Sequence, residues 1–344
     1  MNRLLLALLA LSLVSACGSG GGSGGSGGDV NDVLANDEED GGDEETPPDE
    51  EEPPTDGEEE VPDGVTGIPE TLSQNVTSFA FSPDKGTVTI SLDGVDTTPI
   101  EATYARNPAL DMGGYLAYSV QEDSLDRLYI AMAQETADGG ARAVAVGDGG
   151  QFNRVLPGGF YERDGDYTPP AVGVGPGAGQ VSYAGNYTAI TNATSSDGSA
   201  LLPVDTTQPG LPDLPGQPAM VRATIFFNAN FAENKINGSI NNRQLISPID
   251  GTATETWEDI ELIITDIDEN GEFFGDAEHD GRLNVDVGDY GGIISGADGS
   301  YVSGIVALSD STQSRENDTE VGVFVLTQCG KDGDAAVCDQ VQPN

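Results

Sequence analysis

The sequence predicts an all-β fold: an antiparallel up-and-down β-barrel of about eight strands at the C-terminal end, preceded by a smaller β domain and a disordered acidic tether. Three observations lead to this prediction. Apolar and polar residues alternate along residues 65–344, turn residues recur about every 8 to 15 positions, and no segment keeps helical spacing over three turns. Consecutive short strands without crossover helices favour a closed barrel, because closure removes exposed sheet edges.

The chain begins with a predicted secretory signal peptide, residues 1–16. Arg3 precedes the apolar run LLLALLALSLV, and small residues follow it, which is the usual order of such a peptide. The run is too short for a membrane helix, which needs roughly 20 apolar residues. Its end, LVSAC, resembles the bacterial lipobox, whose cysteine is lipidated and becomes the mature N-terminus. Cys17 is therefore the predicted site of acylation, including palmitate; an ordinary signal peptide with an incidental cysteine is the alternative.

Residues 17–66 are predicted to form a disordered tether behind the lipidated cysteine. Residues 18–64 contain eighteen Asp and Glu residues among Gly, Ser and Pro, and no Lys or Arg, so they cannot bury a core. As an ideal coil this segment would span roughly 35 to 40 Å, and self-repulsion of its acidic part extends it. Such a tether would keep the body clear of the membrane. A merely solubilising tail has the same composition and is the alternative.

The body that follows the tether is also strongly acidic. The whole chain has 59 acidic and 13 basic residues and a net charge of −46; outside the tether and Arg3, 41 acidic residues stand against 12 basic ones. Phosphate recognition needs clustered Lys and Arg, and the sequence has no such cluster. Nucleic acid is therefore excluded as a predicted partner, whereas the charge suits a soluble body outside the cell.

The segment TPPAVGVGPGAGQ, residues 168–180, is the predicted boundary between two domains. It separates an N-terminal β domain, 67–178, from a C-terminal barrel domain, 179–344. In VRATIFFNANF the odd-numbered residues from Val221 to Phe231 share one face, and in RLNVDV the residues Leu283, Val285 and Val287 do so. These apolar faces are predicted to point inward.

Several barrel segments resemble those of a known family. VSYAGNYTAI, ATIFFNANFAENKINGSINN, NGEFFG and YGGIISGADGSYVSGIVALS, within residues 181–309, are similar to motifs in the C-terminal barrel of transferrin-binding protein B-like surface lipoproteins. The resemblance implies display on the bacterial surface by an acyl anchor, and it implies that the upstream β region corresponds to the family's smaller handle-like domain. The matching positions, such as Tyr183, Gly185 and Tyr187, are packing and turn residues. The family's transferrin contacts lie in long loops that have no match here, so transferrin binding is not implied.

Two cysteines lie near the C-terminus. Cys329 and Cys338 flank the segment GKDGDAAV, and in an exported protein this spacing predicts a disulfide. The bond would close a loop of about ten residues, contribute roughly 2 to 3 kcal/mol and pin the last strand. A metal site is the alternative, but the only histidine, His279, is far away in the sequence.

The segment DIDENG, residues 266–271, matches the first half of an EF-hand loop. Asp266, Asp268 and Asn270 occupy the positions of three calcium ligands, and a glycine follows them. However, Ala277 occupies the twelfth position, where an EF-hand has a bidentate Glu, and no helix is predicted beside the segment. Asn270-Gly271 between two apolar runs indicates a β-hairpin, because both residues tolerate positive φ. We expect the hairpin, with weak calcium binding as the alternative; no other cofactor is predicted.

The sequence does not predict an enzyme. A catalytic triad would have to use His279, which lies in the charged segment GDAEHDGR, where a solvated histidine is expected. Gly-x-Ser-x-Gly occurs only in the Gly/Ser-rich start of the tether, residues 21–28, which is not a nucleophile elbow. A secreted hydrolase is therefore only the third hypothesis for the chain.

Residues 191–220 form the segment with the best pattern for ligand recognition. They are a long Pro- and Gly-rich insert between two predicted strands, and connections of this length are usually functional or disordered. A disordered filler needs no apolar anchors, whereas the insert contains several, so both interpretations stay open. The candidate ligand-binding residues are Leu201, Leu202, Leu211 and Leu214.

These features predict a non-enzymatic, lipid-anchored protein of the bacterial outer membrane, exposed on the cell surface. We expect its barrel loops to bind an extracellular protein or a small-molecule ligand. A surface-export or receptor protein of the outer membrane is a further expected partner. The alternative is a passive acidic envelope-coat protein, or a structural protein that responds to calcium.

Overall fold

The computed structural model describes residues 67–92, 100–175, 177–193, 201–204, 213–248, 250–282, 284–312, 315 and 317–340. All of these residues belong to one compact unit, Glu60–Asn344. The predicted signal peptide (1–16), the predicted acylation site Cys17 and the predicted tether (17–66) lie outside the described residues.

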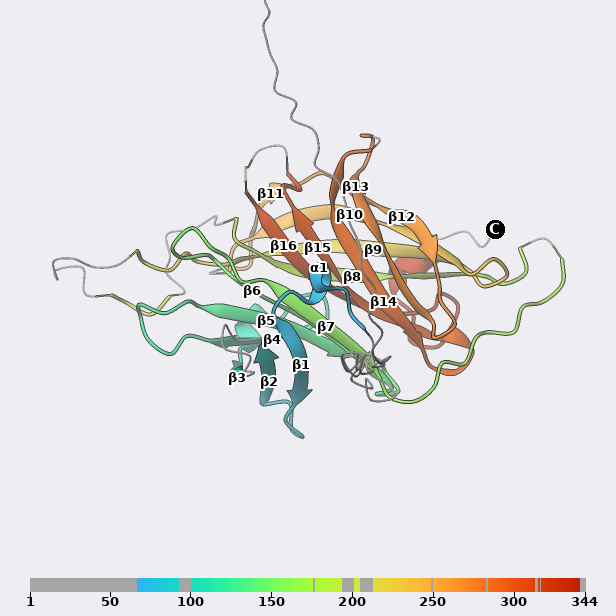
Figure 1. The fold of residues 1–344 in the computed structure, drawn as a ribbon, viewed down its shortest axis with the longest axis horizontal. Helices are drawn as coiled ribbons and strands as arrows, with labels where there is room; N and C mark the ends of the chain where they lie inside the picture. Colours follow the sequence, from blue (N-terminus) through green and yellow to red (C-terminus); the bar gives the residue numbers. More distant parts are fainter. Residues whose placement is uncertain are drawn as a thin grey trace, which may run out of the picture. The chain divides into compact units, whose positions relative to one another are not determined.

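The described residues form sixteen strands and four short helical turns (Figure 1). Their bounds are α1 Glu70–Ser73, β1 Val76–Phe81, β2 Thr87–Leu92, β3 Ile100–Arg106, η1 Pro108–Leu110, β4 Leu116–Val120, β5 Tyr129–Glu135, β6 Ala141–Asp148, β7 Gly158–Arg163, β8 Gln180–Thr191, β9 Ala219–Asn230, β10 Lys235–Ile246, β11 Ala253–Thr256, β12 Ile260–Asp266, β13 Glu272–His279, β14 Asp286–Ser295, η2 Ala297–Gly299, β15 Tyr301–Ser309, β16 Thr319–Thr327 and η3 Ala336–Gln340. Over these described ranges, no helix is long and apolar enough to cross a membrane.

Eight of the strands form a closed antiparallel barrel, which confirms the predicted fold class. The order around the barrel is β8, β9, β10, β12, β13, β14, β15 and β16, and β16 pairs back onto β8. The remaining strand of this sheet, β11, lies beside the second half of β10. Strands that follow one another in the sequence are neighbours in the barrel, apart from β11, so the barrel has an up-and-down topology; the connection between β8 and β9 is the long insert.

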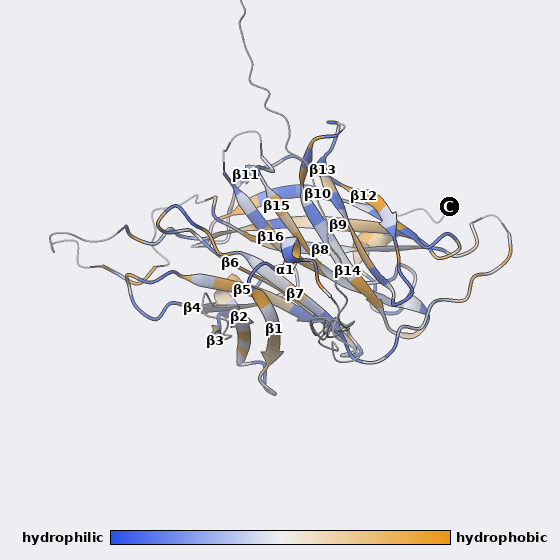
Figure 2. Cartoon of the chain, viewed as in Figure 1, coloured by the Kyte–Doolittle hydropathy of each residue, from blue (hydrophilic) through white to orange (hydrophobic). Residues whose placement is uncertain are grey.

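The barrel interior is filled by side chains from alternate positions of its strands. On β9 and just beyond it, the odd-numbered residues from Val221 to Phe231 are buried, which confirms the inward face predicted from VRATIFFNANF. The ring centroid of Phe227 lies 4.9 Å from that of Phe324, 5.9 Å from that of Phe273 and 6.0 Å from that of Tyr290. Such aromatic pairs add about 0.5 to 1.5 kcal/mol each to the burial of the rings. Hydrophobic and hydrophilic residues alternate along the strands accordingly (Figure 2).

The region before the barrel is a seven-stranded antiparallel sheet, with β1 to β7 in chain order. It curls until β7 returns to β1: a Cβ atom added at Gly158 would overlap the backbone of Ser73 and the side chain of Val76. The predicted domain boundary lies in the connection between β7 and β8, and the division into domains 67–178 and 179–344 stays a prediction. The inner side of the sheet carries its own core, which includes Val88, Ile90, Tyr104, Tyr118 and Phe160.

The other side of this sheet packs on the barrel. Apolar side chains from β5, β6 and β7 meet those from β8, β14, β15 and β16 in a shared core, and the fully buried Leu72 of α1 joins them. Glycines permit the close approach, since a Cβ atom at Gly147 would overlap Ile190 and one at Gly159 would overlap Ile305. The two sheets therefore pack directly on each other.

Tyr115 links the two sheets by hydrogen bonds. Its hydroxyl donates to the carbonyl oxygen of Asn186 on β8 at 2.9 Å and accepts from the N–H of Val325 on β16 at 2.9 Å. The regular ladder between β8 and β16 ends at Thr188 and Val323. The hydroxyl thus bridges two backbone groups that the barrel strands do not join directly.

One predicted strand is wrong. RLNVDV does not form a strand with a single inward face: β14 begins one residue after Val285, and the side chain of Val285 is 38% exposed. Val287 is buried as predicted, and Leu283 lies outside the described residues. The physical reason is backbone conformation, because Asn284 has a φ of 60°, in the left-handed region that an extended strand does not use. The sequence pattern also fails to predict β3 and β11.

A buried ion pair lies inside the barrel. Arg243 and Glu320 are both fully buried, and Nη2 of Arg243 lies 2.6 Å from Oε2 of Glu320. The same nitrogen donates to Oγ of Ser311 at 2.8 Å, and the hydroxyl of Tyr187 donates to Oε1 of Glu320 at 2.8 Å. The guanidinium also lies 5.4 Å from the ring centroid of Trp257, within reach of a cation–π interaction. Both charges therefore have partners despite complete burial.

We expect Glu320→Gln to destabilise the fold strongly. The substitution leaves the buried Arg243 without its carboxylate, a loss that typically costs about 3 to 5 kcal/mol. Urea titration should show a loss of this size in the free energy of unfolding, and the melting temperature should fall by roughly 10 °C. The control is Glu135→Gln in the half-exposed Lys85–Glu135 ion pair, which should cost under about 1 kcal/mol. Equal losses in the two variants would contradict this account.

Candidate functional site

Three loops meet at one end of the described unit, on the left in Figure 1. They are residues 121–128 between β4 and β5, residues 149–157 between β6 and β7, and residues 201–204 and 213–218 from the insert between β8 and β9. We call these segments the loop platform. Arg127 joins the first two loops, because its guanidinium pairs with the buried carboxylate of Asp148 and donates to the carbonyl oxygens of Gln151 and Arg154, each at 2.7 Å.

The insert between β8 and β9 is fastened to the same cluster. The side-chain amide of Gln151 donates to the carbonyl oxygen of Asp213 at 2.8 Å, and the N–H of Gly216 donates to the carbonyl oxygen of Gly150 at 2.7 Å. A Cβ atom at Gly149 or at Gly216 would overlap the backbone of the opposite segment. This approach therefore requires glycine at both positions.

The loop platform exposes large apolar side chains. Phe152 is 57% exposed, and Leu202 and Leu214 are each 44% exposed. The N–H of Leu202 donates to Oε1 of Gln121 at 2.8 Å, which holds this leucine beside the loop after β4. Sequence reasoning missed Phe152, although an aromatic residue inside the Gly-rich turn GDGGQFN is a usable signal. The four predicted leucines divide into the exposed Leu202 and Leu214, the half-buried Leu201, and Leu211, which lies outside the described residues.

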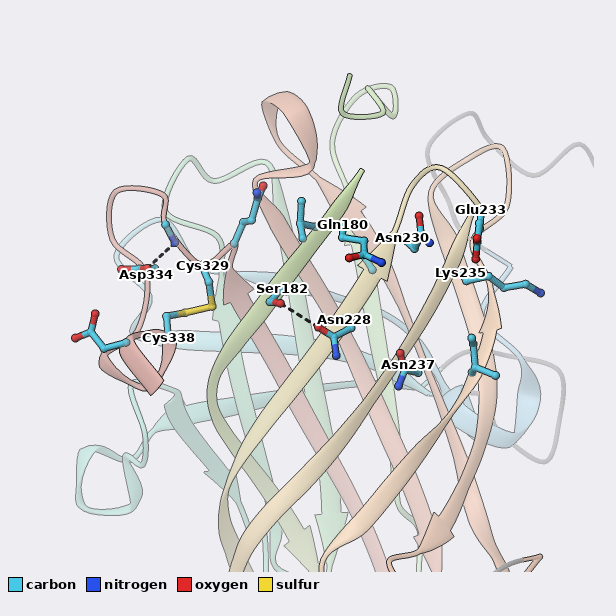
Figure 3. A pocket seen from close by; sticks show the side chains of 16 residues that line it. Gln180, Ser182, Asn228, Asn230, Glu233, Lys235, Asn237, Cys329, Asp334 and Cys338 are labelled. Carbon is cyan, nitrogen blue, oxygen red and sulfur yellow. Dashed lines mark hydrogen bonds between the residues drawn. A yellow bond between two sulfur atoms is a disulfide. The ribbon is translucent and has the colours of Figure 1, made fainter. Parts of the chain in front are cut away.

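A second candidate surface is a groove of about 610 Å³ on the outer face of the barrel (Figure 3). Ser182, Asn228 and Asn237, one each from β8, β9 and β10, lie in register across its floor. The loop closed by Cys329 and Cys338 borders it on one side. Sequence reasoning missed this groove because outward-facing Asn residues look like an ordinary solvated sheet face. The signal for it is the spacing of Asn residues in NANFAENKINGS.

Cys329 and Cys338 are joined by a disulfide, with Cα atoms 5.3 Å apart. Cys329 comes two residues after β16, and Cys338 lies in η3. The N–H of Cys329 also donates to the carbonyl oxygen of Ser182 at 2.8 Å. The bridged loop is thus attached to β8 and holds the chain that leaves the last strand, the role expected from the sequence.

The segment DIDENG forms the expected hairpin between β12 and β13. The carboxylate of Asp268 accepts from the N–H groups of Asn270 and Glu272, at 2.9 and 2.8 Å, and the carboxylate of Asp266 pairs with Lys235. Gly271 has a φ of 75°, whereas Asn270 is not among the described residues with positive φ, so only one of the two turn residues uses the left-handed region. No group of three or more His, Cys, Asp and Glu side chains suited to a metal occurs within the described ranges. Weak calcium binding at this turn stays a prediction.

His279 is buried, so the expectation of a solvated histidine is wrong. It is the last residue of β13, is paired with Ile260 of β12, and is only 4% exposed. Burial lowers the pKa of its imidazole, and the positive charge of Arg282 lowers it further; Glu258 has a smaller opposite effect, and Arg243 adds a still smaller lowering. The strand pairing therefore takes the imidazole out of water and favours its neutral form.

The chain is similar to solved structures of two TbpB proteins and of a protein described as a surface lipoprotein. Intact Ap-TbpB with its N and C lobes is 11% identical, with 72% of this chain and 53% of that chain covered and a TM-score of 0.34. A double mutant of transferrin binding protein B from Haemophilus parasuis Hp5 is 10% identical, with 74% and 54% covered and a TM-score of 0.36. A protein described as a surface lipoprotein is 16% identical, with 74% and 96% covered and a TM-score of 0.31.

This chain matches about half of the length of the two transferrin-binding proteins. At these identities and TM-scores the likeness concerns the general course of the chain alone. No protein-family model and no curated protein matches the sequence.

We expect stability to fall on mild acidification because of His279. A histidine whose pKa is lower in the folded than in the unfolded state does not change the stability at a pH above its unfolded pKa of about 6.5. Below that pH the unfolded state binds the proton more readily, so the free energy of unfolding falls. Since the chain has a single histidine, one imidazole NMR signal should titrate with a midpoint below about 6.5. The variant His279→Gln has no imidazole, so its free energy of unfolding should fall less between pH 6.5 and 5 than that of the wild type. A midpoint above 6.5 would contradict the burial of this side chain.

Proposed function

We propose that the chain is a non-enzymatic, lipid-anchored protein of the bacterial cell surface whose loop platform binds an extracellular protein. The observation that carries the proposal is the exposure of Phe152, Leu202 and Leu214 on loops that are held firmly in place. Large apolar side chains on a fixed, otherwise polar surface are typical of protein interaction sites. They also cost little entropy when they bind, because the loops beneath them are already ordered.

The ordering of the loop platform comes from its contacts with the sheets. Asp148, at the end of β6, is 3% exposed and accepts from the N–H of Leu156 at 2.7 Å in addition to its pair with Arg127. An ion pair this deeply buried fixes the loop backbone, since moving either partner would leave an unpaired charge. The exposed apolar residues are thus presented by a rigid base, as hot spots in protein interfaces usually are.

Attachment to the outer membrane is supported by the sequence LVSAC and by the acidic residues that follow it. Acyl chains contribute about 0.8 kcal/mol per buried CH₂, and stable anchoring takes more than one chain. Display on the outer surface would require an export partner in the outer membrane. The proposal that the chain is not an enzyme is supported by the burial of its only histidine within a strand pair.

We expect Cys17→Ser to release the protein from the membrane. Serine cannot carry the thioether-linked lipid, so the variant should move from the membrane pellet to the soluble fraction and lose incorporation of labelled palmitate. Ser19→Ala, two residues outside the predicted lipobox, is the control and should fractionate like the wild type. If Cys17→Ser stays in the membrane and keeps its label, the anchor is misplaced. Protease treatment of intact cells then separates surface display from a periplasmic location.

We expect the triple variant Phe152→Ser, Leu202→Ser and Leu214→Ser to lose the extracellular partner. Because these side chains are exposed, the substitutions should change the free energy of unfolding by about 0.5 kcal/mol or less each, while loss of interface anchors typically weakens binding by more than tenfold. Extracellular proteins captured by the immobilised wild type should be identified and their affinities for each variant measured.

The matched control is Val174→Ser, which removes a fully exposed apolar side chain outside the loop platform, on the connection between β7 and β8. It should bind the same partner as tightly as the wild type. A partner that binds the triple variant unchanged would refute the loop platform as its site. A wild type that captures no partner would favour the passive envelope-coat alternative.

A further inference from the structure

The groove on the outer face of the barrel has a floor of neutral polar side chains. Ser182 on β8 is the register partner of Asn228 on β9, which is in turn the partner of Asn237 on β10. Neighbouring strands are about 4.8 Å apart, so these side chains form a continuous row across the strands (Figure 3). Toward the strand ends, Gln180 and Asn230 form a second such pair. The floor is therefore a small array of amides and a hydroxyl.

Much of the hydrogen-bonding capacity of this array is unused. The hydroxyl of Ser182 donates to Oδ1 of Asn228 at 3.0 Å, which leaves the NH₂ group of Asn228 available. Oδ1 of Asn230 accepts from the N–H of Ala232 at 3.0 Å, which likewise leaves its NH₂ group available. The side chains of Gln180 and Asn237 make no hydrogen bond to any residue that the structure describes. The floor thus presents donors and acceptors side by side.

The charges around the groove exclude anions. The only cation in the lining is Lys235, and its ammonium group already pairs with the carboxylate of Asp266. The other charged lining residues are Glu233, Asp334 and Asp339, all of them acidic. A phosphate, a carboxylate or an acidic sugar would meet repulsion there. Carboxylates can, however, accept hydrogen bonds from neutral hydroxyl groups.

The groove also offers apolar contact next to the amides. Ile264 on β12 is 62% exposed and lines one side. The Cys329–Cys338 disulfide lines the other (Figure 3). A ligand that combines hydroxyl groups with C–H surfaces would match both the floor and the sides. The volume of about 610 Å³ lies within the range of small-ligand sites.

We propose that this groove binds a neutral oligosaccharide. Each sugar hydroxyl is both a donor and an acceptor, as the amides of Asn228 and Asn237 are, and the C–H faces of the ring can pack on Ile264 and on the disulfide. A neutral sugar can form hydrogen bonds with these amides and brings no charge that the groove would have to neutralise. The groove lies on the outer face of β8, β9 and β10 and shares no residue with the loop platform, so this site is independent of the protein-binding function proposed above.

The test uses the full chain and a glycan array that contains lacto-N-tetraose, maltopentaose and tri-N-acetylchitotriose as neutral probes and sialylated lacto-N-tetraose as the acidic counterpart. We expect at least one neutral probe to bind and the acidic probe to bind more weakly than its neutral parent. The double variant Asn228→Ala, Asn237→Ala should weaken the neutral probe about tenfold in calorimetry, the effect of losing two hydrogen bonds.

Asn241→Ala is the matched control, because Asn241 lies on β10 and is not among the groove-lining residues. It should leave the affinity for the sugar unchanged, and circular dichroism should give all variants the same fold. The proposal is overturned if no neutral probe binds, if the acidic probe binds best, or if the double variant binds as tightly as the wild type. A Lys-containing extended peptide that binds in place of the sugars, and is lost in the double variant, would reassign the groove to peptides.

Discussion

The hydroxyl group of Tyr115 is the interaction on which the arrangement of the two sheets depends. It is buried between β8 and β16, where it satisfies the carbonyl oxygen of Asn186 and the N–H of Val325. Burial raises the pKa of this phenol well above its usual range, so the group keeps the proton that it donates. Without it, two partly buried backbone groups would lose this hydrogen-bond partner. The seven-stranded sheet is thus hydrogen-bonded into the wall of the barrel as well as packed on it.

This attachment also explains why loops far apart in the sequence form one platform. Gly147, near the end of β6, lies directly on Ile190 of β8 and Val321 of β16. The loop that follows β6 therefore begins beside the insert that follows β8. Gly149 and Gly216 then let the two backbones touch, and Arg127 joins the loop after β4 to the loop after β6. The loop platform therefore results from the packing of the two sheets, which brings the three loops together.

Much of the fold could be predicted because it depends on local alternation. The inward face of β9 is visible in VRATIFFNANF, and the hairpin at Gly271 is visible in its turn residues. Arg243 could not be predicted as a buried residue, because strict alternation from Ile240 places it on the outer face. A register shift in β10 between Asn241 and Gln244, with a φ of 58° at Asn242, turns it inward toward Glu320, a residue that is 77 positions away. The groove was missed for a similar reason, since the strand register is needed to align Ser182 with Asn228 and Asn237.

The two candidate surfaces share one physical property, which follows from the charge of the chain. A body with 41 acidic and 12 basic residues repels anions, but at physiological salt this field decays over about 8 Å. Close contact is then governed by the groups at the surface itself. The apolar side chains of the loop platform and the amides of the groove are uncharged, and Arg127 and Lys235 are already paired. Recognition at the groove must therefore rest on shape, apolar burial and neutral hydrogen bonds, because its lining cation Lys235 is already paired. The loop platform differs in one respect, since the exposed Arg154 adds a positive charge beside its apolar side chains.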